Sequence, residues 1–229
     1  MITLKKIAFS AAALAISLGM GLTVASGAQA SGKRYYEVTV QNLTYGQPIS
    51  PPVIVTHKQG FSLFNAGEAA SDDLAALAED ADNSGLVSFL ESQRRVASVA
   101  VGAGPIPPGQ AQSTIVETEG NANFISAIGM LVNTNDAFFG VRHFRISRSF
   151  RSIRTTRSPA YDAGSEANNE DCGFIPGPAC GTPFVRATDG AEGIIHIHRG
   201  VHGVGDLEPS IYDWRNPAVQ VSIRRVEQP

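Results

Sequence analysis

The stretch that decides the fold is YYEVTVQNL, residues 35–43. Apolar side chains alternate with polar ones along it, and the apolar set is Tyr36, Val38 and Val40. Successive side chains on a β-strand point to opposite faces of the sheet. The alternation therefore predicts a strand with one face in a core and the other in solvent.

Similar short segments recur along the chain. PAVQVSIRRVE, residues 217–227, places Val219, Val221 and Ile223 on one face. Further strands are expected within residues 50–57, 94–104, 112–120, 122–133, 138–150 and 193–200. Turns rich in Gly and Pro, such as PIPPGQ at 105–110, separate them, and strands do not alternate with helices. Six to eight short strands of this kind predict an all-β protein, built as an antiparallel β-sandwich.

One region has a helical pattern and is expected to form an insertion in the sandwich. Ser71 is a good N-cap, with Asp72 and Asp73 in the first turn, where the helix dipole favours acids. The apolar stripe predicted for this helix is Leu74, Leu77 and Ala81, and that of a second short helix is Leu86, Phe89 and Leu90. Helix is therefore expected mainly over residues 71–92.

The first thirty residues have the layout of a secretory signal. Lys5 and Lys6 precede an uncharged apolar run over residues 7–24, and Ala28-Gln29-Ala30 supplies a small-x-small cleavage pattern. The run has 18 residues, so an uncleaved membrane anchor is the alternative. We expect cleavage after Ala30, no other membrane span, and a single secreted or periplasmic domain over residues 31–229.

The charge balance argues against a nucleic-acid partner. The chain has 18 Lys and Arg against 21 Asp and Glu, and the first thirty residues hold two of the lysines and none of the acids. Residues 31–229 therefore carry a net charge of −5, the opposite of the basic surface that nucleic acids require.

The loop SPAYDAGSEANNEDCGFIPGPACG, residues 158–181, holds the only two cysteines, Cys172 and Cys180. In an exported protein two such cysteines pair, and closing this short ring contributes about 2–3 kcal/mol. The alternative is a metal site of two thiolates, but the two cysteines are not at the spacing usual for zinc ligands. The loop also holds four acids, namely Asp162, Glu166, Glu170 and Asp171. They are calcium ligands or simply solvated carboxylates.

The segment GIIHIHRG and the histidine after it offer a second metal site. His196, His198 and His202 would supply three imidazoles for zinc or copper, in a carrier or a metalloenzyme. The alternative is that His196 and His198 form the solvent face of a strand whose isoleucines face the core. No Gly-x-Ser-x-Gly nucleophile elbow is present, so a hydrolase is not indicated.

Arginines recur at every third residue between 142 and 157, with no acid between them. The series is Arg142, Arg145, Arg148, Arg151, Arg154 and Arg157. A basic stripe of this kind suits an acidic polysaccharide or a lipid head group. The alternative is a solvated strand and loop whose charge the following acidic loop balances.

Two motifs in order resemble the N-terminal spondin domain known from F-spondin and mindin, in particular its bacterial members. They are MLVNTNDAFFGV at 130–141 and AYDAGSE at 160–166, and the segments at 38–44, 51–57 and 63–82 also look like that family. The resemblance covers essentially all of residues 31–229. It implies a C2-like antiparallel β-sandwich with a binding or adhesion role and no catalysis. Together with the arginine series, this leaves as expected partners an extracellular protein or an acidic polysaccharide or lipid head group.

The resemblance also implies one calcium ion, held by three acidic side chains. By motif these are Asp136, Asp162 and Glu166. The chain departs from the family pattern at several positions: Asn135 replaces Pro, Ala137 and Tyr161 replace Trp, and Glu166 replaces a shorter Asp. The longer Glu166 side chain changes the reach of the third ligand by one methylene.

Overall fold

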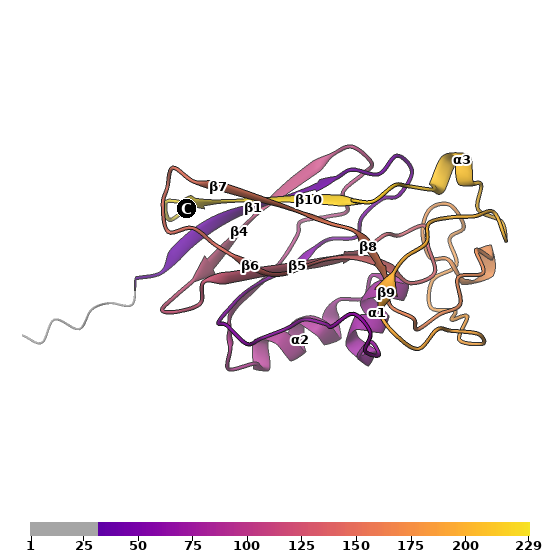
Figure 1. The fold of residues 1–229 in the computed structure, drawn as a ribbon, viewed down its shortest axis with the longest axis horizontal. Helices are drawn as coiled ribbons and strands as arrows, with labels where there is room; N and C mark the ends of the chain where they lie inside the picture. Colours follow the sequence, from indigo (N-terminus) through magenta and orange to yellow (C-terminus); the bar gives the residue numbers. More distant parts are fainter. Residues whose placement is uncertain (1–31) are drawn as a thin grey trace, which may run out of the picture. The chain divides into compact units, whose positions relative to one another are not determined.

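Two antiparallel sheets build the protein, as the alternating segments predict. The computed structural model describes residues 32–229, so the predicted signal peptide over residues 1–30 lies outside the described part. The first sheet has the order β4-β1-β10-β7, and the second has the order β3-β2-β5-β6-β8-β9. Figure 1 shows the two sheets as separate layers. The prediction of an all-β sandwich with a helical insertion is confirmed.

The ten strands have the following bounds: β1 (Arg34–Asn42), β2 (Val53–His57), β3 (Val96–Val101), β4 (Ala111–Thr118), β5 (Phe124–Met130), β6 (Ala137–Arg145), β7 (Ile153–Ser158), β8 (Ala160–Asp162), β9 (His196–Ile197) and β10 (Val219–Val226). The helices are α1 (Asp72–Asp80), α2 (Ser84–Ser92), the 3-10 turn η1 (Cys172–Phe174) and the short α3 (Pro209–Tyr212).

The opening stretch and the closing stretch of the domain pair with each other. In the β1–β10 ladder Val38 lies opposite Ile223 and Val40 lies opposite Val221, and all four are buried. The polar residues between them face the other side of the sheet. The main core lies between the two sheets because both present such an apolar face inward.

Helices α1 and α2 cover the outer face of the second sheet (Figure 1). Leu74, Leu77 and Leu90 pack there against Val53 and Val55 of β2. Strand β2 is thus buried on both faces, which explains its unbroken apolar run. Ser71 caps α1 as predicted, its side chain accepting a hydrogen bond from the Leu74 N–H.

The structure corrects two details of the expected helical stripes. The first helix ends before Ala81, which is its C-cap in a left-handed conformation (φ 59°), and Ala78 completes the buried stripe instead. In the second helix Leu86 and Leu90 are buried, whereas Phe89 is exposed.

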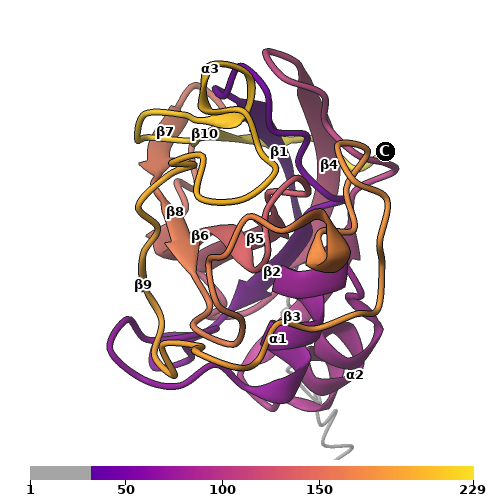
Figure 2. The ribbon, with the colours of Figure 1, turned by 90° about the vertical axis from the view of Figure 1, so that its right-hand side faces the viewer.

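The segment between β8 and β10 contains little regular structure. Residues 193–200 were expected to form a strand, but only His196–Ile197 pair, with β8. The strands β7 and β8 within residues 153–162 were not expected. Figure 2 shows the loops of residues 163–208 gathered at the end of the sheets that carries β8 and β9. Within residues 32–229, no helix is long and apolar enough to cross a membrane.

Candidate metal site

Two buried aspartates meet where β6 begins and β8 ends. Asp136 directly precedes β6, and Asp162 is the last residue of β8. The two strands pair so that Ala137 lies opposite Asp162, and the Ala163 N–H donates to the Asp136 carbonyl at 3.2 Å. Both aspartate side chains are fully buried. The pairing of two short strands thus places two carboxylates, 26 positions apart in the sequence, next to each other.

The Asp136 carboxylate is only half satisfied. Its Oδ2 accepts hydrogen bonds from the Ser165 N–H at 2.8 Å, the Ser165 hydroxyl at 3.2 Å and the Glu166 N–H at 3.0 Å. Its Oδ1 is buried and has no hydrogen-bond partner among the described residues. Burial and the facing Asp162 carboxylate raise the pKa of Asp136 well above its ordinary value. A buried carboxylate oxygen without a hydrogen-bond donor is stabilised by binding a proton or a cation.

Asp162 is held by the loop that follows it. Its Oδ1 accepts a hydrogen bond from the Gly164 N–H at 2.7 Å, and its Oδ2 accepts one from Asn168 Nδ2 at 2.5 Å. Gly164 has a φ of +66°, and an added Cβ there would meet the Ile194 carbonyl oxygen at 2.3 Å, so the turn requires glycine. Burial also raises the pKa of Asp162.

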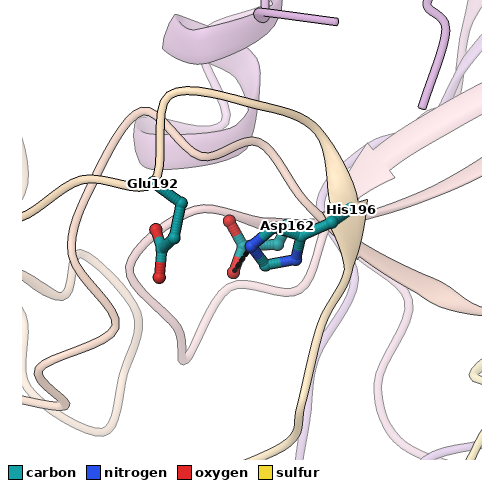
Figure 3. Close-up of side chains that lie close together, drawn as sticks. All are labelled: Asp162, Glu192 and His196. Atoms are coloured by element: carbon teal, nitrogen blue, oxygen red, sulfur yellow. Dashed lines mark ion pairs between the residues drawn. The ribbon is translucent and has the colours of Figure 1, made fainter. Parts of the chain in front are cut away.

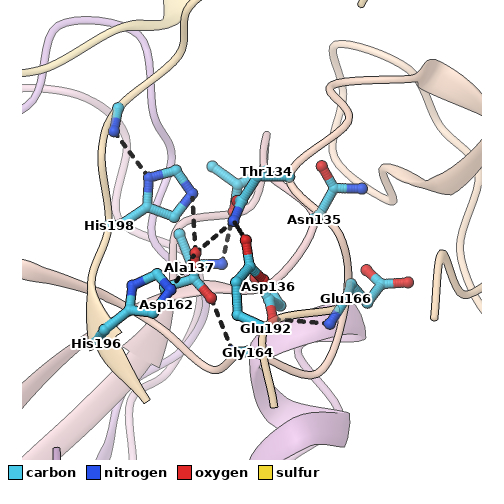
Figure 4. Close-up of polar contacts among 12 residues, drawn as sticks. Thr134, Asn135, Asp136, Ala137, Asp162, Gly164, Glu166, Glu192, His196 and His198 are labelled. Carbon is cyan, nitrogen blue, oxygen red and sulfur yellow. Dashed lines mark hydrogen bonds and ion pairs between the residues drawn. The ribbon is translucent and has the colours of Figure 1, made fainter. Parts of the chain in front are cut away.

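Glu166, the third ligand implied by the resemblance, contacts Asp136 through its backbone N–H, which donates to Oδ2. Its carboxylate points away from Asp162 (Figure 4), and its Oε1 accepts a hydrogen bond from the Ala187 N–H at 2.5 Å. Burial, with the nearby Glu79 carboxylate, raises the pKa of Glu166 to about 7. The structure therefore brings the Asp136 and Asp162 side chains together, while the longer Glu166 side chain reaches a different segment.

Glu192 and His196 flank the Asp162 side chain. Ligand atoms of these three side chains all lie within 4.8 Å of one another (Figure 3). Asn168 Nδ2, besides its bond to Asp162, donates to Glu192 Oε1 at 3.1 Å. His196 Nδ1 lies 3.2 Å from the Ile197 carbonyl oxygen, which can only accept, so a neutral ring carries its proton on Nδ1. The lone pair of that neutral ring is then on Nε2, 4.0 Å from Asp162 Oδ2.

His198 has the opposite tautomer. Its Nδ1 accepts a hydrogen bond from the Gly200 N–H at 3.0 Å, so the proton of the neutral ring lies on Nε2, 4.0 Å from Asp162 Oδ2. The ring is buried against Trp214, and burial lowers the pKa of His198 to about 3. The one lone pair of this neutral ring lies on Nδ1 and is already used by the Gly200 N–H, so His198 is a poor metal ligand.

The three histidines do not form a common site in the described part of the chain. Across residues 32–229, the one cluster of three or more His, Cys, Asp or Glu ligand atoms within 4.8 Å is Asp162, Glu192 and His196. His202 is instead engaged through its N–H, which donates to Glu170. The interpretation of a solvent-facing His strand is also wrong, because His198 is buried and Ile197 is half exposed.

Glu170 and the disulfide organise the loops around the site. The Glu170 carboxylate is buried and accepts three backbone N–H groups: Oε1 from His202 at 2.6 Å, and Oε2 from Gly203 at 2.6 Å and Val204 at 2.9 Å. Two residues later Cys172 is bonded to Cys180, which confirms the predicted disulfide. A cavity of about 10 Å³, room for one water, lies between Glu170 and His198.

Sequence reasoning missed Glu192 because it lies in an irregular loop without any periodic pattern. The one available signal was its spacing of four residues before His196. Asn168 was also missed, since an amide in an acidic loop carries no specific pattern. Glu192 reaches Asp162 because the chain returns to pair β9 with β8, whereas Asn168 reaches it from the loop six residues further on.

The comparisons with known proteins agree with the resemblance noted in the sequence. The model of the Spondin_N family matches residues 44–169, more than half of the chain. The match includes Asp136, Asp162 and Glu166, and it ends before Glu192 and His196. No curated protein matches the chain. The chain is a member of the Spondin_N family.

Proposed function

We propose that this protein is an exported, non-catalytic spondin-type domain that binds calcium where β6 and β8 meet and serves in binding or adhesion. The observation that carries the proposal is the pair of fully buried carboxylates of Asp136 and Asp162, with Asp136 Oδ1 unpartnered in the described residues. Two such carboxylates repel each other unless a proton or a cation lies between them.

Oxygen is the donor type that the site offers most. Asp136, Asp162 and Glu192 supply carboxylates, and the NH₂ group of Asn168 holds the last two in place by donating to both. Calcium takes six to eight oxygen ligands in flexible geometry, whereas magnesium demands a regular octahedron. An irregular loop such as residues 163–170 suits the larger ion. Glu166 becomes a ligand in this proposal only when its side chain leaves the Ala187 N–H.

The non-catalytic role rests on family membership and on the site itself. The spondin N-terminal domain is a non-enzymatic family, and no nucleophile elbow occurs in the sequence. Export is supported by the signal-like first thirty residues and by the Cys172–Cys180 disulfide, a bond typical of oxidising compartments.

Calcium titration by isothermal calorimetry tests the proposal. We expect wild type to bind one calcium, and Asp162→Asn to weaken binding at least tenfold because it removes a ligand charge. Asp189→Asn is the matched control, since Asp189 is an exposed acid in the same loop region and makes no hydrogen bond or ion pair to the described residues. Comparing Glu166→Gln with Glu192→Gln identifies the third carboxylate. No heat of binding in chelator-stripped wild type would refute the calcium site.

A second candidate is a transition-metal site at Asp162, Glu192 and His196. The free Nε2 of His196 favours it, since one imidazole and two carboxylates suit zinc or manganese. His196→Ala separates the two candidates: it abolishes zinc binding but leaves calcium binding within about threefold if oxygen ligands hold the ion. Metal analysis of protein purified without chelator shows which ion it carries.

A further inference from the structure

The middle of the arginine series, from Arg145 to Arg154, lies at the end of the sandwich opposite the metal site. Arg142, by contrast, lies over the rings of Phe64 and Tyr161, close to that site. Strand β6 starts beside Asp136 and ends at Arg145, about 26 Å away by the rise of a strand. Figure 1 shows the β6–β7 connection at one end of the sheets and β8 with β9 at the other. A site at the arginine end is therefore separate from the metal site.

The positive charge at this end is not neutralised by ion pairs. Within residues 32–229, none of the six arginines between 142 and 157 forms a salt bridge. In the acidic loop expected to balance them, Asp162, Glu166 and Glu170 instead accept hydrogen bonds from the backbone N–H groups of residues 164, 187 and 202. The balancing interpretation is thus wrong, and the Arg145 and Arg148 guanidinium groups are available to an external anion.

A groove runs through this basic surface. One part has a volume of about 560 Å³ and is lined by Lys58, Gln59, Arg95, Asn121, Asn123, Phe124 and Arg145. The adjoining part, of about 400 Å³, shares Asn123 and Arg145 with it and adds Ile146 and Arg148. No acid lines either part. Two hollows with common walls suit a ligand made of repeated units rather than a single small ion.

Two cations of the groove are held in position by neutral groups. Arg148 Nη2 donates to Asn123 Oδ1 at 3.3 Å, and Arg95 Nη1 donates to the Gln59 carbonyl at 2.8 Å. Each of these bonds uses one of the five N–H donors of a guanidinium. The remaining donors can bind the two oxygens of a sulfate, phosphate or carboxylate as a fork.

We propose that this groove binds an anionic polysaccharide, with Arg145 and Arg148 contacting its sulfate, phosphate or carboxylate groups. The carboxamides of Gln59 and Asn121 suit sugar hydroxyls, and the ring of Phe124 suits the apolar face of a sugar. A lipid surface would meet a flat or convex face more readily than this concave one.

The test measures binding of the purified protein to dextran sulfate, with neutral dextran and phosphatidylglycerol vesicles as comparison probes, in EGTA. The test variant is Arg145→Gln with Arg148→Gln. The matched control is Arg157→Gln with Arg199→Gln, which removes the same charge from exposed positions outside the groove that form no salt bridge to the described residues. Melting temperatures of both variants check that they fold.

We expect dextran sulfate to bind, neutral dextran not to bind, and the groove variant to weaken binding about fivefold to tenfold, from two lost ionic contacts. The control variant should change the affinity less than twofold, and added salt should weaken wild-type binding. Equal losses in both variants, absent binding, or binding to vesicles alone would overturn the proposal. EGTA keeps the outcome independent of calcium binding.

Discussion

Replacing Glu170 with Gln is expected to destabilise the loops over the metal site. The Glu170 carboxylate accepts three backbone N–H groups from residues 202–204, two of them at Oε2. The Gln side chain has the same shape, but only one of its two polar atoms can accept. Even with the amide oxygen at the Oε2 position, the NH₂ group faces the His202 N–H, and a donor then meets a donor.

The size of the effect follows from these contacts. A hydrogen bond to a charged group contributes about 1.5–3 kcal/mol to the free energy of unfolding. A buried donor left without a partner adds its own desolvation penalty. The substitution removes one hydrogen bond and leaves the other two with a neutral acceptor, so it lowers the free energy of unfolding by about 3 kcal/mol. For a domain of this size that lowers the melting temperature by roughly 6–12 °C.

The assay is thermal unfolding followed by circular dichroism, with and without calcium. Glu91→Gln is the control, because Glu91 is exposed on α2 and undergoes the same chemical change. Calcium affinity should fall as well, since Asn168, two residues before Glu170, donates the hydrogen bond that holds Asp162 Oδ2 in position. A decrease below about 2 °C, equal to that of the control, would refute the reasoning that this carboxylate holds the loops together.

Two further predictions concern the same loops. Replacing Cys172 and Cys180 together with Ser should lower the free energy of unfolding by about 2.5 kcal/mol, the loop-entropy value for this short ring, as measured by urea denaturation; an unchanged midpoint would contradict it. Because the pKa of Glu166 is about 7 in the folded protein and 4.5 ordinarily, the folded state binds more protons than the unfolded state between these values. Metal-free protein should therefore gain stability, by up to about 3 kcal/mol, as the pH falls from above 7 towards 4.5. Glu166→Gln should flatten this dependence, and a loss of wild-type stability over that interval would count against the burial of its carboxylate.

The sequence alone determined the fold class, the helical insertion, the disulfide and the family. Alternation of apolar and polar residues in 35–43 and 217–227 is a local property with the period of a strand, and the two segments form the β1–β10 ladder. The N-cap at Ser71 is also local, and it survives in the structure. Cys172 and Cys180, the only cysteines, had one possible intramolecular partner each.

The make-up of the metal site was decided by tertiary structure. The motifs pointed to Asp136 and Asp162, but the direction of the Glu166 carboxylate depends on where the Ala187 N–H lies, 21 residues further along an irregular loop. The approach of Glu192 and His196 to Asp162 depends on how the same loop folds back over β8. The available charge of the arginine end was equally hidden, because only the fold places the acidic loop at the opposite end of the sheets. Periodicity reports the face on which a side chain lies, whereas contacts between distant loops depend on how the whole chain packs.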